Sequence, residues 1–319
     1  MRKYQTIYIM SCLILFLGMV NLYAQEETPA RKMAKDADYT RVKDFNVSFL
    51  SEVFDASDLD FDVVGGKNYL LLIACDKYKY WKPLFNAVKD AQDVKKILMD
   101  RYGFEPNNIF ELLNEEVTLE AVEAQFQALI KKGTNLDNLL IYYSGHGYYD
   151  SSFDLGYWVP YDGRTNSAAT SSYIPNDKIR DYIKEMNFRH VFMVADACFS
   201  GSLFSTETTR GSMKEESVKS RWGLSSGNLE VVSDGKKGEN SPFAKAFMDF
   251  LNSNLQDKLL VDPLIQYVIS TVKENSEQEP RGSELVGVGS EGGQFVFTLQ
   301  GQTEATEEKD PKSKSKSKE

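Results

Sequence analysis

The sequence predicts an α/β fold with a mainly parallel central sheet covered by helices on both faces. Two observations carry this prediction. Residues 69–74, 139–143 and 191–195 are continuous apolar runs, which is the pattern of strands buried on both faces. Amphipathic segments separate these runs, and such an alternation of strands and helices is typical of a parallel sheet.

The other elements follow from local signals. The segment after the first strand places apolar residues on one helical face and stops at Gly103. A later helix is capped by Thr118 and ends at Gly133. In chain order, we expect a helix at 86–102, a strand at 109–113, helices at 118–133 and 175–186, a strand at 229–232, helices at 242–251 and 263–274, and a closing strand at 294–299.

The N-terminus has the pattern of an export signal. Arg2 and Lys3 precede an apolar run that ends before a polar stretch, and we expect cleavage after Ala24. The run is shorter than the roughly 20 residues of a spanning helix. A periplasmic or secreted protein with no stable membrane association is therefore expected, and an uncleaved N-terminal membrane anchor is the alternative.

The rest of the chain divides by composition. Residues 25–64 form a polar arm followed by irregularly spaced apolar residues, which indicates an extra strand or a pro-segment. Residues 65–300 carry the alternating pattern of the main domain. Within it, 203–222 is rich in Ser, Thr, Glu and Lys and is expected to be an exposed loop. Residues 301–319 are a charged Lys-Ser tail that we expect to be disordered.

The charge of the chain restricts its partners. The formal net charge is −10, and removing Arg2 and Lys3 with the signal leaves 35 basic and 47 acidic residues, a net charge of −12. This balance argues against nucleic acid as a main partner and suits a basic substrate.

Two unusual sequences follow predicted strands. Gly145 and Gly147 flank His146 directly after the strand at 139–143, and Cys198 leaves the strand at 191–195 in a turn of small residues. Ligands bind beyond the carboxyl ends of strands in open parallel sheets. A cysteine needs a neighbouring imidazole or helix end to ionise near neutral pH, so His146 and Cys198 are a candidate base and nucleophile.

Two other residues offer alternatives to this pair. His190 lies at the far end of the strand that leads to Cys198, roughly 26 Å away at about 3.3 Å per residue, so it is expected to be a surface residue and not the base. Cys75 lies in the first apolar run, where a buried, inert thiol is expected. A disulfide between Cys75 and Cys198 is the alternative in an exported protein.

The two motifs, "YYSGHG" and "DACFSG", resemble those of the caspase-like cysteine peptidases (peptidase family C14), in particular the metacaspase and bacterial caspase-homologue branch. His146 precedes Cys198 by 52 residues, close to the spacing of about 50 in caspases, although Asp196, Phe199 and Ser200 depart from the caspase form of the cysteine motif. The stretches "LFNAVKDAQDVKKIL", "GYWVPYDG", "YIPNDKIRDYI" and "SPFAKAF" extend the resemblance over about 67–299.

The resemblance implies a caspase-like three-layer sandwich around a six-stranded sheet. It also implies a mechanism in which Cys198 attacks a peptide carbonyl, His146 transfers the protons and water hydrolyses the acyl-enzyme. The backbone N–H groups of Gly147 and Cys198 would bind the oxyanion. A protein or peptide is the expected substrate, and a catalytically silent scaffold or adaptor of the same fold is the alternative.

The resemblance further implies a preference for Arg or Lys at P1, the residue before the cleaved bond. Asp90 and Asp196 match the acids of a basic P1 (S1) pocket, where two carboxylates would bind a cation by charge-assisted hydrogen bonds. A solvated helix residue and a turn residue are the alternatives for the two acids. Tyr157 and Trp158 are expected either to line substrate subsites or to belong to the core.

Two further points stay open in the sequence. Arg210, Lys214, Lys219 and Arg221 would make the 203–222 segment a self-cleavage site, unless it is only a flexible loop. Some relatives need calcium, to which Asp150 or Asp162 could contribute, but the spacing of an EF-hand is missing. We therefore assign no metal and no cofactor.

Overall fold

The computed structural model describes residues 66–166, 169–197, 218–227 and 235–300. Several expectations fall outside these residues. They are the export signal at 1–24, the arm or pro-segment at 25–64, Cys198, residues 203–217 of the expected loop, the strand at 229–232 and the tail at 301–319.

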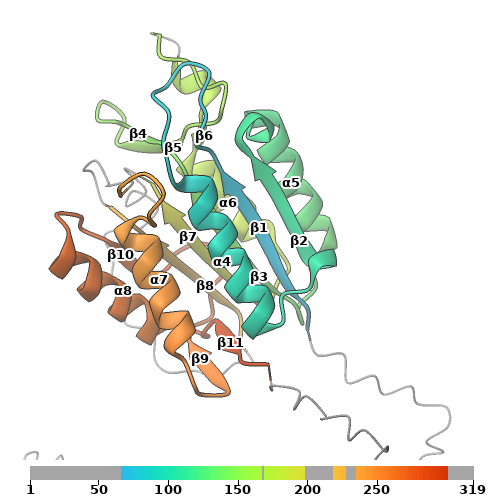
Figure 1. The fold of residues 1–319 in the computed structure, drawn as a ribbon. Coiled ribbons are helices and arrows are strands. Elements are labelled where there is room, and N and C mark those ends of the chain that lie inside the picture. The colour runs from blue at the N-terminus through green and yellow to red at the C-terminus, as the bar shows by residue number, and fades with distance from the viewer. Residues whose placement is uncertain (1–65, 167–168, 198–217, 228–234, 301–319) are drawn as a thin grey trace, which may run out of the picture. The chain divides into compact units, whose positions relative to one another are not determined.

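The central sheet has six strands in the order β10-β8-β7-β3-β1-β2 (Figure 1). All neighbours in this sheet pair in parallel except β10, which pairs antiparallel with β8 at one edge. The strands are β1 (Asn68–Ala74), β2 (Ile109–Leu113), β3 (Asn138–Ser144), β7 (His190–Asp196), β8 (Ser220–Ser225) and β10 (Arg281–Glu284). The predicted fold class, a mainly parallel six-stranded sheet in an α/β domain, is confirmed.

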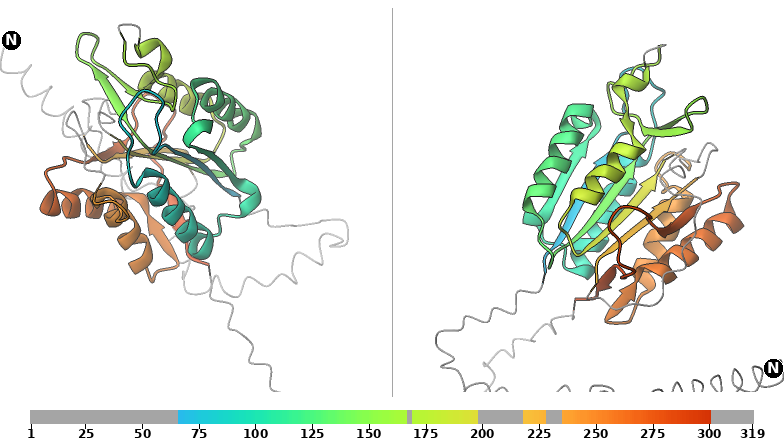
Figure 2. Two further views of the ribbon diagram at one scale, coloured as in Figure 1. Left: turned by 45° about the horizontal axis from the view of Figure 1, so that its top comes forward. Right: turned by 180° about the vertical axis from the view of Figure 1, so that it is seen from behind.

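Helices cover both faces of this sheet. The α-helices are α4 (Ala87–Tyr102), α5 (Leu119–Lys132), α6 (Asn176–Glu185), α7 (Pro242–Ser253) and α8 (Val261–Asn275), and the 3-10 turns are η2 (Pro106–Asn108), η3 (Asn114–Glu116) and η4 (Ala169–Ser172). Figure 1 shows α4, α7 and α8 in front of the sheet, and the view from behind in Figure 2 shows α5 and α6 on the opposite face.

Alternation along the strands builds a separate core on each face. Leu70 and Leu72 of β1 pack toward α4, α7 and α8, whereas Leu71 and Ile73 pack toward α5 and α6. Successive side chains of a strand point to opposite faces, so a strand between two helical layers needs apolar residues at every position. This requirement explains the continuous apolar runs.

Local signals set the ends of two helices as expected. Gly103 ends α4 in the left-handed conformation, with φ of 69°, which glycine adopts without steric cost. The Thr118 side chain accepts a hydrogen bond from the backbone N–H of Ala121 at 3.1 Å and so caps α5.

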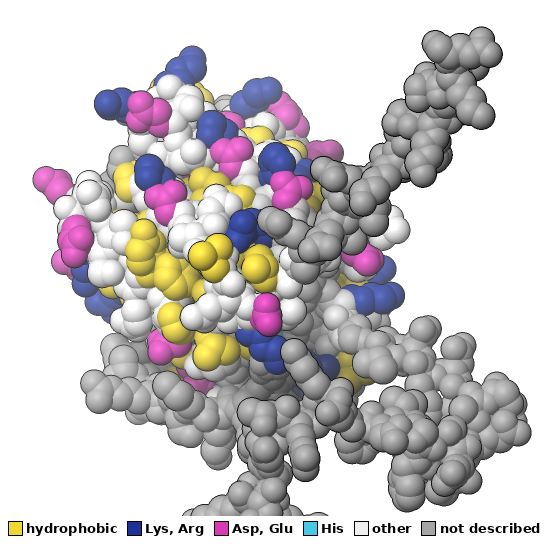
Figure 3. Space-filling view, turned by 60° about the horizontal axis from the view of Figure 1, so that its bottom comes forward, with side chains coloured by type: hydrophobic (Ala, Val, Ile, Leu, Met, Phe, Trp, Pro, Cys, Tyr) yellow, Lys and Arg dark blue, Asp and Glu magenta, His cyan; other side chains and the backbone are white. Residues whose placement is uncertain are grey.

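Two small sheets lie outside the central one. Strands β4 (Gly147–Asp150), β5 (Leu155–Trp158) and β6 (Ile174–Pro175) extend the carboxyl end of the central strands, at the top of Figure 1. The predicted closing strand forms β11 (Val296–Thr298), which pairs with β9 (Lys258–Leu260). Seen from below, Figure 3 shows hydrophobic side chains gathered among charged ones.

The prediction of an exposed loop at 203–222 is wrong at the C-terminal end of this range. Ser220, Arg221 and Trp222 begin β8, and every residue of this strand is buried. Arg221 is 1% exposed, and its guanidinium donates hydrogen bonds to the backbone carbonyl oxygens of Met186, Phe188, Arg189 and Ser220. Because a peptidase needs an accessible, extended chain, Arg221 is not a candidate for self-cleavage in the folded protein.

Replacing Arg221 with methionine is expected to lower the free energy of unfolding by about 2–4 kcal/mol, because the carbonyl oxygens around it would lose their charged donor. Urea denaturation of the full chain measures this loss. Arg281→Met is the matched control, because Arg281 is exposed on β10 and its replacement should change stability by less than about 0.5 kcal/mol. Equal midpoints for the two variants would contradict the stabilising role of Arg221.

Candidate active site

The carboxyl ends of β1, β3 and β7 bring the candidate residues to one edge of the sheet. Ala74 pairs with Ser144, and Ser144 pairs with Asp196, so these strands end at the same level. His146 lies two residues beyond Ser144. Cys198 follows Asp196 by two residues in the sequence and lies outside the described residues.

The backbone of His146 is held from three sides. Its N–H donates to the Tyr78 hydroxyl at 2.7 Å. Its carbonyl oxygen accepts from the Tyr143 hydroxyl at 2.6 Å and from the Val159 N–H at 2.9 Å. Tyr78 comes from the loop between β1 and α4, Tyr143 comes from β3 and Val159 directly follows β5, so three parts of the fold fix the position of the histidine.

The imidazole ring is oriented by the same loop. Its Nε2 lies 2.8 Å from the carbonyl oxygen of Lys82, and the rings of Tyr78 and Trp81 lie with their centroids 4.7 and 5.2 Å from that of His146. A carbonyl oxygen only accepts hydrogen bonds, so Nε2 carries the proton in the neutral ring and Nδ1 keeps its lone pair. The geometry thus leaves Nδ1 as the basic atom.

Burial favours the neutral form of this histidine. Desolvation among the surrounding side chains lowers the pKa of His146 below its usual value, and the hydrogen bond to Lys82 opposes the shift only in part. A neutral imidazole at pH 7 is the state that a general base requires.

The two candidate acids lie together and are buried. Asp90, on α4, is 1% exposed, and Asp196, at the end of β7, is 7% exposed. Both contact Ser241: its N–H donates to Asp90 Oδ2 at 3.1 Å, and its hydroxyl donates to Asp196 Oδ2 at 2.6 Å. Asp90 Oδ1 also accepts from the Asn240 side-chain amide at 2.7 Å. The solvated alternative for Asp90 is therefore wrong.

Burial and the nearby charge of Asp196 raise the pKa of Asp90 to about 7, against the lowering effect of the hydrogen bonds from Asn240 and Ser241. The buried hydroxyl of Tyr142, on β3, feels the charges of both acids. Among the described residues this hydroxyl has no hydrogen-bond partner. The site thus contains two close, buried acids, of which the charge of Asp196 opposes the ionisation of Asp90, beside a buried hydroxyl without a partner among the described residues.

The remaining candidates lie as follows. Gly147 is buried directly after His146, as the first residue of β4. Tyr157 and Trp158 are buried in β5, and Trp158 stacks on Tyr143 with ring centroids 4.1 Å apart, so both belong to the core. Asp150 ends β4, where its side chain accepts from the Ser152 N–H at 2.9 Å.

The thiol of Cys75 is free and fully buried, and burial raises its pKa to about 12, as expected of an inert thiol. The expectation for His190 is partly wrong. It begins β7, far from the carboxyl edge as expected, but it is 3% exposed and its Nδ1 lies 2.8 Å from the Ser220 hydroxyl oxygen. Its neighbours are Ser220 of the adjacent strand β8, which the sequence did not predict, and the Phe295 ring, whose centroid lies 6.4 Å from that of His190.

Several residues of the site were not predicted from the sequence. Tyr78 and Trp81 lie in a loop without periodicity, and the contribution of Lys82 is a backbone carbonyl that every residue type has. Asn240 and Ser241 precede α7, where a serine before a proline indicates a helix cap and not a contact with the acids.

Within the described ranges, no group of three or more His, Cys, Asp or Glu side chains is placed to hold a metal ion. None of the helices in the described part of the chain has the length and apolar character needed to span a membrane.

A family model and a curated relative link the chain to one family, and a solved structure is similar to it. A family model described as "Caspase domain" matches residues 67–286. Metacaspase-1 of Eremothecium gossypii is 26% identical in an alignment of 169 residues that covers 48% of this chain and 37% of that protein's own length. The crystal structure of protein GSU0716 from Geobacter sulfurreducens is 17% identical, covers 73% of this chain and 97% of its own, and has a TM-score of 0.49.

Proposed function

The chain belongs to the caspase-domain family, and we propose that it is a cysteine endopeptidase in which Cys198 is the nucleophile and His146 the base. One observation carries the proposal. His146 presents a neutral imidazole, anchored through Nε2 on the Lys82 carbonyl, at the end of the strand next to the one that leads to Cys198.

The proposed reaction uses the free nitrogen of this ring. Nδ1 of His146 takes the thiol proton as the Cys198 sulfur attacks the peptide carbonyl carbon, and the imidazolium then gives the proton to the leaving amine. A water molecule attacks the resulting thioester, passing a proton to Nδ1, and the carboxylic acid leaves as the thiolate re-forms and regains its proton. The N–H groups of Gly147 and Cys198 are the proposed oxyanion donors.

The acid pair supports a preference for Arg or Lys at P1. A guanidinium or ammonium group that enters beside Asp90 and Asp196 would compensate two buried carboxylates and could donate to the Tyr142 hydroxyl oxygen. The same pocket would repel an acidic P1 side chain. By charge alone, the proposed pocket would favour basic over acidic substrates.

Peptide assays test both parts of the proposal. The chain without residues 1–24 is expected to hydrolyse fluorogenic peptides that end in Arg or Lys, to leave the matched Asp peptide uncut, and to lose activity in Cys198→Ala. Each assay is run with and without calcium. A preference for Asp would refute the specificity. A folded wild type that cuts none of the peptides in either condition would favour the scaffold alternative.

A further inference from the structure

The segment before α7, residues 236–241, holds the acid pair in place. Ser241 is the cap of α7: its Oγ accepts from the Ala244 N–H at 3.0 Å while its hydroxyl proton is donated to Asp196. Its N–H is donated to Asp90. A helix cap thus joins α4, α7 and the end of β7 at one residue.

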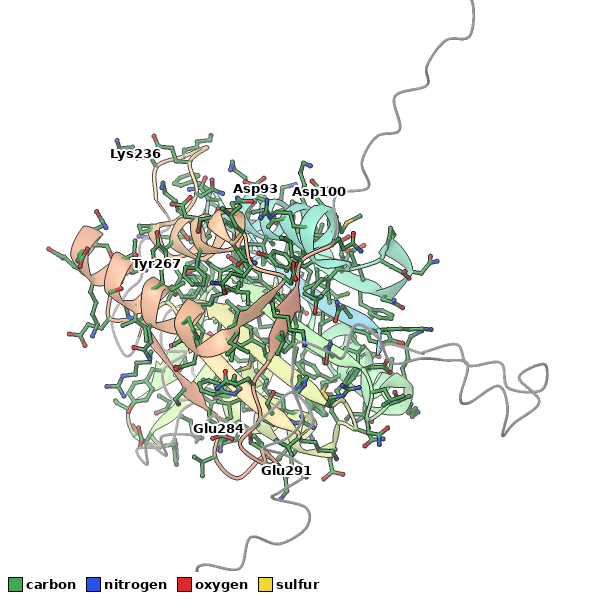
Figure 4. All side chains as sticks on the ribbon, turned by 90° about the horizontal axis from the view of Figure 1, so that it is seen from below. Asp93, Asp100, Lys236, Tyr267, Glu284 and Glu291 are labelled. Atoms are coloured by element: carbon green, nitrogen blue, oxygen red, sulfur yellow. The ribbon has the colours of Figure 1, made fainter. Side chains whose placement is uncertain are left out.

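Asn240 makes a second connection, between the buried acid and the surface. Both of its hydrogen bonds come from the same amide nitrogen: Nδ2 lies 2.7 Å from Asp90 Oδ1 and 2.9 Å from Asp93 Oδ2. Asp93 also accepts from Lys89 at 2.6 Å. Figure 4 shows Asp93, on α4, and Lys236, in the segment before α7, at one edge of the molecule.

Two hydrogen bonds join this segment to the loop between β1 and α4. The Asn86 side chain donates to the carbonyl oxygen of Lys236 at 2.9 Å and accepts from the N–H of Gly238 at 2.9 Å. Gly238 has a φ of 86°, a left-handed conformation that a residue with a Cβ rarely adopts. Asn240 therefore reaches Asp90 from a backbone with fixed geometry.

A neutral donor, such as the Asn240 amide, is suited to the position beside Asp90. Asp90 lies in a site where burial and the charge of Asp196 favour the protonated carboxyl, and the Asn240 amide opposes both by donating to the ionised form. Among the described residues, the other titratable groups around the pair are Asp93 with its ion-pair partner Lys89, on the same helix, and Tyr142, on β3. A fixed lysine in place of Asn240 would instead neutralise the charge that the substrate must meet.

We propose that Asn240 is a positioning residue for the P1 pocket: its amide holds Asp90 in place as an ionised acceptor for the basic side chain of the substrate. This inference rests on the proposed function, because it assigns Asn240 a role in the same pocket. Asn240 acts through Asp90 and takes no part in the reaction at Cys198.

The test is the pH profile of kcat/KM on a peptide with Arg at P1, measured for wild type, Asn240→Ala and Asn252→Ala. Asn252 is an exposed asparagine on α7 and serves as the matched control. Asn240→Ala is expected to move the acid limb of the profile about one unit higher, which lowers kcat/KM on the order of tenfold at pH 6 and restores it near pH 9. Asn252→Ala should follow wild type.

A loss of activity in Asn240→Ala that is equal at every pH, or a profile that superimposes on wild type, would overturn the proposal. A second readout does not depend on hydrolysis: carbon NMR of the Asp90 carboxyl, assigned with Asp90→Asn, should show a higher pKa in Asn240→Ala than in wild type. An unchanged pKa overturns the inference even if the enzyme is active. A wild type that hydrolyses no basic peptide refutes the proposed function, whatever Asp90 does in the NMR titration.

Discussion

Replacing His146 with alanine is expected to lower kcat for a peptide with Arg at P1 by roughly 10²–10⁴-fold. The variant loses the group that accepts the thiol proton and protonates the leaving amine. The Lys82 carbonyl and the Tyr78 and Trp81 rings cannot replace it, because none of them is a base near neutral pH. Steady-state kinetics on the chain without residues 1–24 measures the effect.

His190→Gln is the control for this experiment, because it replaces the second histidine of the chain at the opposite end of β7. Glutamine can keep a hydrogen bond to Ser220, so kcat should stay near that of wild type even if the variant is less stable. A His146→Ala protein that retains more than a tenth of the wild-type kcat would exclude His146 as the base.

Replacing Asp90 with asparagine is expected to weaken catalysis and to strengthen the fold at the same time. The pKa of Asp90 is about 7 in the folded chain, against its usual 3.8. Between these values the folded protein holds a proton that the unfolded chain has released, so this group makes stability fall as the pH rises from about 4 to 7. The shift of about three units corresponds to at most about 4 kcal/mol.

Asp90→Asn removes this unfavourable charge. The amide keeps only one acceptor oxygen for the Asn240 and Ser241 donors, a loss that does not depend on pH. The variant's free energy of unfolding in urea, relative to wild type, should therefore be higher at pH 8 than at pH 4, where the wild-type carboxyl is already protonated. Its kcat/KM for the Arg peptide should fall at least on the order of tenfold at pH 8, because a charged partner of the P1 side chain is lost.

Asp93→Asn is a control for which the expected change in the free energy of unfolding has the opposite sign. Partial burial raises the pKa of Asp93, but hydrogen bonds from Asn240 and Lys89 outweigh it and leave the pKa below its usual value. The ionised Asp93 therefore stabilises the fold, and its replacement should lower stability at pH 8. A loss of stability in Asp90→Asn at pH 8 as large as that in Asp93→Asn would contradict the account of a strained buried charge.

The sequence predicted the elements whose signal is local. The strands β1, β3 and β7 are apolar at nearly every position, and Gly103 and Thr118 mark helix ends by their own backbone and side-chain chemistry. Strand β8 was missed because its sequence, Ser-Arg-Trp-Gly-Leu-Ser, has no continuous apolar run. Arg221 is compatible with burial only because carbonyl oxygens from the segment before β7 and from its own strand surround its guanidinium.

By itself, the sequence determined the fold class, the family resemblance, and the identity of His146, Asp90 and Asp196 as candidates, because these depend on residue type and order. Only the tertiary structure decided the chemical state of these groups. The tautomer of His146 depends on a carbonyl from another loop, and the ionisation of Asp90 depends on burial, on Asp196 and on Asn240, 150 residues away in the chain. Electrostatic and hydrogen-bond energies depend on distance in space, which the order of residues does not specify.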